Sequence, residues 1–178
     1  MKLKGRTAAI LIDDFHQELD VWYPYLRLIE EGMRVSLVGT GSGTSYLGKH
    51  GYPVSVDISA STVRDRRFDL IVIPGGWAPD TLRVVPEVLD IVRGAFDRKS
   101  VVLCVGRGGW VLASAGVLQG KRMTAYVAIK DDLVHAGAEY MDSECVCDGN
   151  LVTARNAFDL PAAMREVVRL LGRPSAPV

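Results

Sequence analysis

The sequence has no excess of charge of either sign. Lys and Arg together number 21 in the 178-residue chain, and Asp and Glu also number 21, so the formal net charge is zero. A general nucleic-acid binder needs surplus cations to neutralise phosphates, and attachment to an anionic membrane surface needs them as well. We therefore expect neither nucleic acid nor membrane among the partners of this protein.

A long apolar run is also missing near the N-terminus. The first apolar stretch, Ala8 to Ile12, ends at Asp13 and Asp14. It is too short for the core of a signal peptide, which needs about seven or more apolar residues, and for a membrane span of about 20. The sequence therefore predicts a cytoplasmic protein.

Cysteine is scarce, with only three residues, Cys104, Cys145 and Cys147. Cys145 and Cys147 are two positions apart in an apolar run, where a strand would point both side chains the same way and disfavour a disulfide between them. The spacings H-x-x-x-H and C-x-x-C are absent, which argues against a metal site. We therefore expect the three cysteines to have a structural role only, and we expect the protein to bind no cofactor.

Short apolar runs alternate with segments of helical periodicity. The sequence predicts strands over residues 8–12, 35–38, 70–73 and 101–105, a hairpin over 145–153, and helices over 19–31, 86–96, 110–115 and 158–171. The Gly- and Ser-rich stretch 39–51 fits a loop or a small hairpin. This alternation predicts one α/β domain over residues 1–172, with a mainly parallel sheet covered by helices on both faces and a frayed tail over 173–178.

In such folds, ligands bind at the carboxyl ends of the strands. That rule selects three segments, which are Asp13 to Glu18, Pro74 to Asp80, and Gly106 to Trp110.

Ordered motifs over nearly the whole chain carry a resemblance to a known family. They are Trp22-Tyr23-Pro24, Gly48-Lys49-His50-Gly51-Tyr52, Pro74-Gly75-Gly76-Trp77-Ala78-Pro79-Asp80, Trp110 to Gly116, Ile129 to Leu133, and Asp148 to Thr153. The chain resembles the ThiJ/PfpI superfamily, which includes intracellular proteases and glyoxalase- and deglycase-like proteins, and within it the PfpI-like branch. The resemblance implies a flavodoxin-like fold with a sharp turn, the nucleophile elbow, after the fourth strand.

The family's elbow, A-x-C-H-G-x-x, differs here at its reactive positions. Gly106 stands at the cysteine position and Arg107 at the histidine position, and counting back from Pro24 places Gln17, with Glu18 beside it, at the partner carboxyl. Glycine has no nucleophile, and neither a guanidinium nor an amide is a practical base. The usual cysteine mechanism is therefore predicted to be lost, unless the elbow is displaced onto Cys104.

The elbow scaffold still predicts a pocket for an anionic or carbonyl-bearing small molecule. Backbone N–H groups at the turn and the Arg107 guanidinium suit a carboxylate or phosphate, and Gly76 matches a family glycine that helps to form an oxyanion hole. The predicted binding residues are Gly75, Gly76, Trp77, Asp80, Gly106, Arg107, Gly108 and Trp110. Asp80 matches a glutamate that PfpI-like proteins present across a subunit interface, so the resemblance also implies a homodimer or larger homo-oligomer.

Other polar side chains are candidates for acid/base chemistry. A histidine is suited to proton transfer near neutral pH, and His135 stands where the family run has asparagine. The candidate catalytic residues are Asp13, Asp14, His16, Gln17, Glu18 and His135.

Three functions remain open at this point. The first is a cysteine-independent small-molecule enzyme of the hydratase, lyase or isomerase type, which we favour because Arg107 and His135 are costly residues to place around a useless cavity. The second is a non-catalytic protein that binds a metabolite or partner. The third is peptidase or glyoxalase/deglycase activity through a displaced Cys104.

Overall fold

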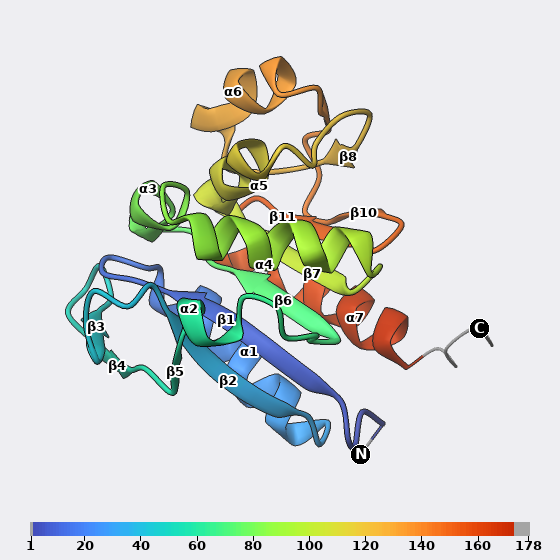
Figure 1. The fold of residues 1–178 in the computed structure, drawn as a ribbon. Coiled ribbons are helices and arrows are strands. Elements are labelled where there is room, and N and C mark those ends of the chain that lie inside the picture. Colours follow the sequence, from blue (N-terminus) through green and yellow to red (C-terminus); the bar gives the residue numbers. More distant parts are fainter. Residues whose placement is uncertain (1, 173–178) are drawn as a thin grey trace.

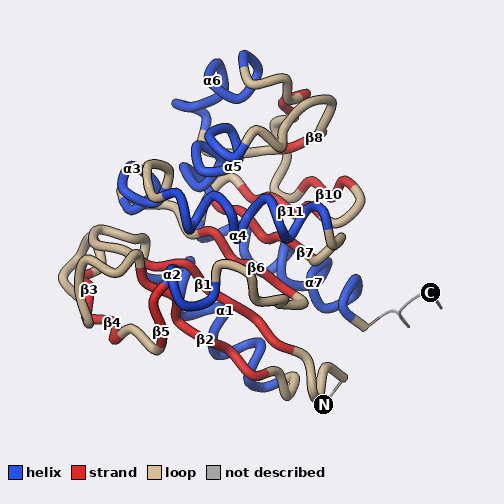
Figure 2. The backbone as a smooth tube through the Cα atoms, in the orientation of Figure 1, coloured by secondary structure: helices blue, strands red, loops and turns tan. Residues whose placement is uncertain are grey.

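A seven-stranded sheet forms the centre of the protein (Figures 1 and 2). The computed structural model describes residues 2–172, so the predicted tail at 173–178 lies outside the described residues. The strands are β1 (Thr7–Ile12), β2 (Arg34–Gly39), β5 (Ile58–Ser59), β6 (Leu70–Ile73), β7 (Val101–Val105), β10 (Val146–Asp148) and β11 (Leu151–Ala154). Their order is β10-β11-β7-β6-β1-β2-β5. Only the β10–β11 pair is antiparallel, so the predicted mainly parallel sheet is confirmed.

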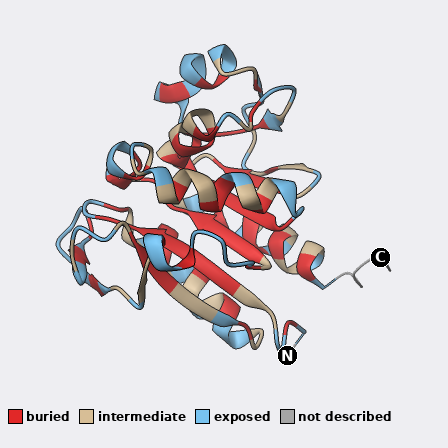
Figure 3. Cartoon of the chain, viewed as in Figure 1, coloured by how far each residue is buried: buried red, intermediate tan, exposed pale blue. Residues whose placement is uncertain are grey.

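Helices cover both faces of the sheet, as the sequence predicts. One face packs against α1 (Glu18–Glu30) and α7 (Leu160–Leu171). The other face packs against α2 (Ala60–Val63), α3 (Ala78–Leu82), α4 (Pro86–Asp97) and α5 (Gly109–Ala115), and α6 (Lys130–His135) packs on α5. The core strands are buried on both sides (Figure 3). Their continuous apolar runs follow from this two-sided burial.

Several short elements lie outside the main sheet. The Gly- and Ser-rich stretch 39–51 supplies β3 (Ser45–Leu47) and the turn of a small hairpin, whose second strand, β4 (Pro53–Ser55), follows just beyond it, in agreement with the hairpin alternative. A two-strand parallel pair, β8 (Arg122–Met123) and β9 (Glu139–Tyr140), was not predicted, because two-residue strands are too short to show periodicity. No helix among residues 2–172 is long and apolar enough to cross a membrane.

The order of the strands determines where a site forms. Strands β7, β6 and β1 are parallel neighbours, so the loops that follow their carboxyl ends lie beside one another. Two hydrogen bonds tie the β1 and β6 loops together, from the Gln17 N–H to the Gly75 carbonyl at 3.2 Å and from the Trp77 N–H to the Phe15 carbonyl at 2.8 Å. The three segments selected from the sequence therefore meet at one edge of the sheet.

Candidate functional site

The turn after β7 has the sharp geometry expected of an elbow. The chain leaves β7 through Gly106, whose φ of +56° lies in the left-handed region, and a 3₁₀ turn over Gly106–Gly108 leads directly into α5. Glycine adopts this conformation at little cost. At Gly108, a Cβ atom would lie 2.9 Å from the Ile73 carbonyl oxygen and 3.0 Å from that of Pro74. Gly108 therefore allows the elbow to pack against the loop after β6, and it contributes to the site in this way rather than as a binding residue.

A polar cavity of about 210 Å³ opens at the elbow. The residues that line it are Gln17, Asp20, Lys49, Gly75, Gly76, Gly106, Arg107, Tyr126, Arg155, Asn156 and Ala157. At roughly 30 Å³ per water molecule, the cavity has room for about seven water-sized groups. This volume suits a small metabolite better than a drug-sized ligand or a folded partner.

A buried carboxyl group faces this cavity. Asp20 lies in the first turn of α1 and is 2% exposed. Its Oδ2 atom accepts a hydrogen bond of 2.9 Å from the Gly75 N–H, whereas its Oδ1 atom has no partner among the described residues. Burial raises the pKa of Asp20 to about 7, although the Gly75 hydrogen bond and the charge of Lys49 act in the opposite direction. Asp20 can therefore exchange a proton near neutral pH.

Three cations surround the same cavity. Lys49 is exposed and lines it from the turn between β3 and β4. Arg155 binds Asp159 at 2.8 Å and Asp142 at 2.9 Å, so its charge is already paired. Arg107 has no ion pair among the described residues, and its buried Nε atom has no hydrogen-bond partner there. The lining is therefore electropositive and favours an anionic ligand.

Two aromatic rings lie against the guanidinium of Arg107. Its Cζ atom lies 3.9 Å from the centre of the Trp77 ring and 4.7 Å from that of Tyr126. Both distances are within the range of a cation–π interaction. Trp77 therefore contributes to the site by holding Arg107, and half of its surface remains exposed.

Three of the predicted catalytic residues, Asp13, Asp14 and His16, do not line the cavity and instead form hydrogen bonds within the neighbouring loops. Asp13 is buried and accepts hydrogen bonds from the Asp14 N–H and the Thr40 hydroxyl. Asp14 accepts a hydrogen bond of 2.8 Å from the Leu47 N–H. His16 is completely buried, with Nδ1 bonded to the Asp13 carbonyl at 2.9 Å. These residues fix the loop that precedes α1.

The predicted carboxyl position also needs correction. Gln17 does line the cavity, but Glu18 beside it turns toward the β3–β4 hairpin. There it accepts hydrogen bonds from the His50 N–H at 2.6 Å and from the His50 ring at 2.9 Å. Burial acts to raise the pKa of Glu18, but the hydrogen bonds from His50 outweigh burial and lower it. The acid at the elbow is thus Asp20, which the sequence analysis missed.

Three other predicted residues lie away from the cavity. His135 is exposed in the last turn of α6, which packs on α5, and it does not line the cavity. Trp110 is half-buried against the apolar core and donates a hydrogen bond of 2.7 Å to Asp132. Asp80 is exposed in α3 and does not line the cavity. Its contribution to a neighbouring subunit stays a prediction.

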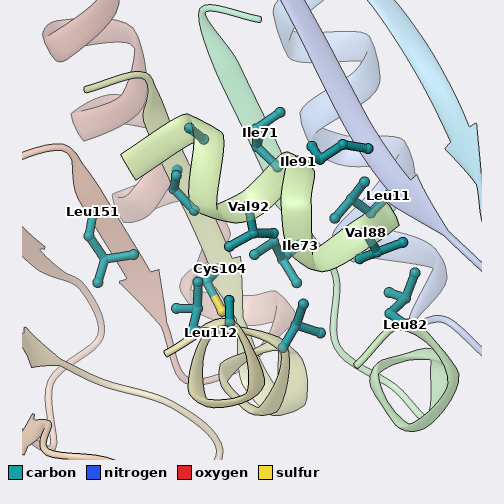
Figure 4. Packing of buried hydrophobic residues seen from close by; sticks show 14 of the residues in the cluster. Leu11, Ile71, Ile73, Leu82, Val88, Ile91, Val92, Cys104, Leu112 and Leu151 are labelled. Carbon is teal, nitrogen blue, oxygen red and sulfur yellow. The ribbon is translucent and has the colours of Figure 1, made fainter. Parts of the chain in front are cut away.

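Cys104 points into the apolar core (Figure 4). It is 2% exposed and lies in the same cluster as Ile73, Val92 and Leu112. Burial raises the pKa of its thiol well above the usual range. A thiol in these surroundings is inert as a nucleophile at neutral pH.

No cluster of ligating side chains suited to a metal ion is found among residues 2–172. None of the three cysteines forms a disulfide. Cys145 and Cys147 are half-buried at one edge of the sheet, distant in sequence from every residue of the elbow.

The cavity also contains residues that the sequence analysis did not select, namely Lys49, Tyr126, Arg155 and Asn156. Lys49 belongs to the motif Gly48 to Tyr52, one of those that carry the family resemblance. Its position in the turn of a small hairpin brings it over the elbow. Tyr126, Arg155 and Asn156 carried no motif signal, and only the fold brings them to the site.

The sequence that forms this elbow and the adjoining Pro-Gly-Gly loop matches a known protein family. The model of the DJ-1/PfpI family matches residues 6–170. The chain belongs to the DJ-1/PfpI family. This confirms the resemblance and the flavodoxin-like α/β fold.

Curated members of the DJ-1/PfpI family are similar to this chain over most of its length. "Deglycase PH1704" of Pyrococcus horikoshii is 43% identical over 155 residues, covering 87% of this chain and 93% of that protein. "Protein/nucleic acid deglycase 2" of Escherichia coli is 35% identical over 170 residues, covering 94% and 99%. The name of the second protein includes nucleic acid among its substrates, whereas the charge balance here led us to expect none.

Solved structures of the DJ-1/PfpI family agree with the fold. A two-domain protein of Anabaena variabilis with DJ-1/ThiJ/PfpI-like and ferritin-like domains has a TM-score of 0.91 at 33% identity. The match covers 94% of this chain and 48% of that one, so this chain spans about half of the two-domain protein. Drosophila melanogaster DJ-1beta has a TM-score of 0.88 at 24% identity, covering 94% and 90%, and supports the fold alone.

Proposed function

We propose that the elbow cavity is the active site of an enzyme that transfers a proton on a small anionic or carbonyl-bearing molecule, without a cysteine nucleophile. The observation that carries the proposal is the buried Asp20 carboxyl. One of its oxygens is anchored on the Gly75 N–H and the other is unpartnered. It faces a cavity lined by Lys49, Arg107 and Arg155.

The environment of Asp20 suits general acid/base catalysis. With a pKa of about 7, both its neutral and its ionised forms are populated at physiological pH. The ionised form can take the proton from a hydroxyl-bearing carbon next to a carbonyl, and the neutral form can return it to the carbonyl oxygen, which gives an enediol. Loss of the proton from the other hydroxyl and its return to the former carbonyl carbon then complete an isomerisation, which needs no co-reactant. Lyase or hydratase chemistry would use the same residue for proton transfer.

The proposal predicts that Asp20→Asn greatly reduces turnover. An amide cannot exchange the proton, but its oxygen can still accept the Gly75 hydrogen bond. We expect kcat/KM for a small hydroxy-carbonyl substrate to fall about 100-fold or more, the usual size of a general acid/base contribution. The wild-type pH profile of kcat/KM should show an apparent pKa near 7, and the measurement is a steady-state assay between pH 5 and 9.

Asp57→Asn is the matched control. Asp57 also accepts a backbone hydrogen bond, of 2.8 Å from the Leu37 N–H, but it lies outside the cavity. The control should keep wild-type turnover. Turnover at the wild-type rate in Asp20→Asn would refute the role of Asp20. Ligand binding without turnover in the wild type would favour a non-catalytic binding protein.

Deglycase activity is the second candidate, and the names of the curated relatives favour it. In this chain it would need either the Gly106 site without a thiol or a displaced Cys104. We expect Cys104→Ala to keep full turnover, and iodoacetamide to leave Cys104 unmodified in the folded protein, because the thiol is buried with a raised pKa. Peptide mass mapping after alkylation checks this, with guanidinium-unfolded protein as the positive control.

Loss of deglycase activity in Cys104→Ala, with the fold intact, would instead favour the family's cysteine chemistry. In that case glycated protein and glycated nucleic acid would both be worth assaying, given the name of the Escherichia coli relative. The expectation that nucleic acid is not a partner would then be tested directly.

A homo-oligomer remains part of the proposal. Exposed apolar side chains of α1 support a protein interface on that helix, namely Leu19, Tyr23, Leu26 and Ile29. Such an interface would be separate from the core contacts that α1 makes through its buried face.

A further inference from the structure

The two rings around Arg107 restrict how a ligand can approach it. Trp77 and Tyr126 both lie against the guanidinium, with ring centres 3.9 Å and 4.7 Å from Cζ. A ligand therefore pairs with the N–H groups that these rings leave free. Two N–H groups of a planar guanidinium match the two oxygens of a carboxylate.

Arg107 is also the cavity arginine with an unpaired charge. Arg155 is already bonded to Asp142 and Asp159, whereas Arg107 has no carboxylate partner within residues 2–172. Its Nε atom is buried and unpartnered there. A buried polar N–H without a partner is costly, and a bound anion would supply the guanidinium with a charge partner.

The free oxygen of Asp20 sets a second requirement on the ligand. Asp20 is 2% exposed, its Oδ1 atom has no partner among the described residues, and the residue lines the same cavity as Arg107. The two residues come from adjoining segments, since the Gly75 N–H binds Asp20 and a Cβ at Gly75 would lie 3.4 Å from the backbone nitrogen of Arg107. A ligand of about seven heavy atoms fills the 210 Å³ cavity. It needs an oxygen next to its anionic group to reach Asp20.

We propose that the ligand of this cavity is a small 2-oxo or 2-hydroxy carboxylate, whose carboxylate pairs with Arg107 and whose adjacent oxygen hydrogen-bonds to Asp20. This inference rests on the proposed function, because it names the substrate class of the same site. Trp77 and Tyr126 act as positioning residues that hold the guanidinium in place.

The first test compares two probes on the wild-type protein by isothermal titration calorimetry. 2-Oxobutanoate has the required carboxylate and carbonyl, and 2-oxobutanamide has the same shape without the charge. We expect the carboxylate to bind and the amide to bind at least 10-fold more weakly, as a charge-assisted pair is lost. Equal binding of the two probes, or no binding of 2-oxobutanoate at millimolar concentration, would overturn the inference.

The second test changes the arginine. Arg107→Met should weaken binding of 2-oxobutanoate at least 10-fold, and Arg107→Lys should recover only part of the loss because lysine lacks the planar fork. Arg83→Met is the matched control, since Arg83 also stacks on a tryptophan, 5.5 Å from the Trp110 ring, outside the cavity. Melting temperatures of all three variants report whether they fold.

The outcomes separate this inference from the proposed function. Asp20-dependent turnover of a neutral carbonyl compound, with no preference for the carboxylate, would overturn the carboxylate assignment and leave the proton-transfer proposal standing. Tighter binding of inorganic phosphate than of 2-oxobutanoate, lost in Arg107→Met, would identify a phosphate site and also overturn it. Carboxylate binding that depends on Arg107, without any turnover, would support the proposed ligand class and contradict the proposed enzymatic activity.

Discussion

Asp20→Asn should stabilise the folded protein by about 4 kcal/mol at pH 8 and change its stability little at pH 4. The pKa of Asp20 is raised from 3.8 to about 7 in the folded state, and each unit is worth about 1.4 kcal/mol. Between these two values the folded state binds more protons than the unfolded state, so the free energy of unfolding falls as pH rises through this window. The variant lacks the titrating group and should not show this loss.

Urea unfolding of both proteins at pH 4, 6 and 8 measures the effect. The informative quantity is the difference between variant and wild type, because other groups titrate in both proteins alike. Asp57→Asn again serves as the control, and we expect no stabilisation at pH 8 from removing that carboxylate. A variant that is equally or less stable than the wild type at pH 8 would show that ionising Asp20 does not destabilise the folded state. The assignment of Asp20 as the general acid/base would then lose its physical basis.

Gly76→Ala should destabilise the protein by about 4 kcal/mol, at the upper end of single substitutions. Gly76 has a φ of +80°, and a Cβ atom there would collide with the backbone, at the Phe15 carbonyl and at 2.5 Å from the Gln17 nitrogen. Both neighbours are main chain and cannot rotate away. The clash would separate the β1 and β6 loops, so binding at the elbow should be lost together with stability.

Gly149→Ala separates the clash from the backbone strain. Gly149 also has a positive φ, +63°, but a Cβ there meets nothing within 4 Å. It should cost only the roughly 1–2 kcal/mol of a left-handed alanine. Similar losses in the two variants, measured by urea unfolding, would mean that the close approach of the two loops is not a structural requirement.

The fold was largely predictable because its signals are local. The apolar runs 8–12, 70–73 and 101–105 are buried on both faces of a parallel sheet, and such strands show continuous apolar sequence. Asp148-Gly149-Asn150 predicted the β10–β11 hairpin from turn chemistry alone. The short pair β8 and β9 had no such signal, since its pairing depends on contacts between distant segments.

The site was predicted less well, because the spacing of residues along the sequence does not tell which way each side chain points. Counting back from Pro24 selected Gln17 as the partner of the elbow, but one helical turn further on Asp20 points inward instead. His135 looked functional as a histidine near a family motif, but α6 turns it to solvent. A signal for Asp20 was present, as an acidic residue in the first turn of a helix that is buried on one face.

The stacking of Arg107 between Trp77 and Tyr126 has a consequence for affinity. A free arginine side chain loses up to about 2 kcal/mol of rotamer entropy when a ligand fixes it. Here the two rings already restrict the rotamers of Arg107 before any ligand arrives. Much of this rotamer entropy is therefore lost when the protein folds and not when the ligand binds. Because the affinity of a very small ligand is limited by its few contacts, this preorganisation lets the cavity select a molecule that offers little surface.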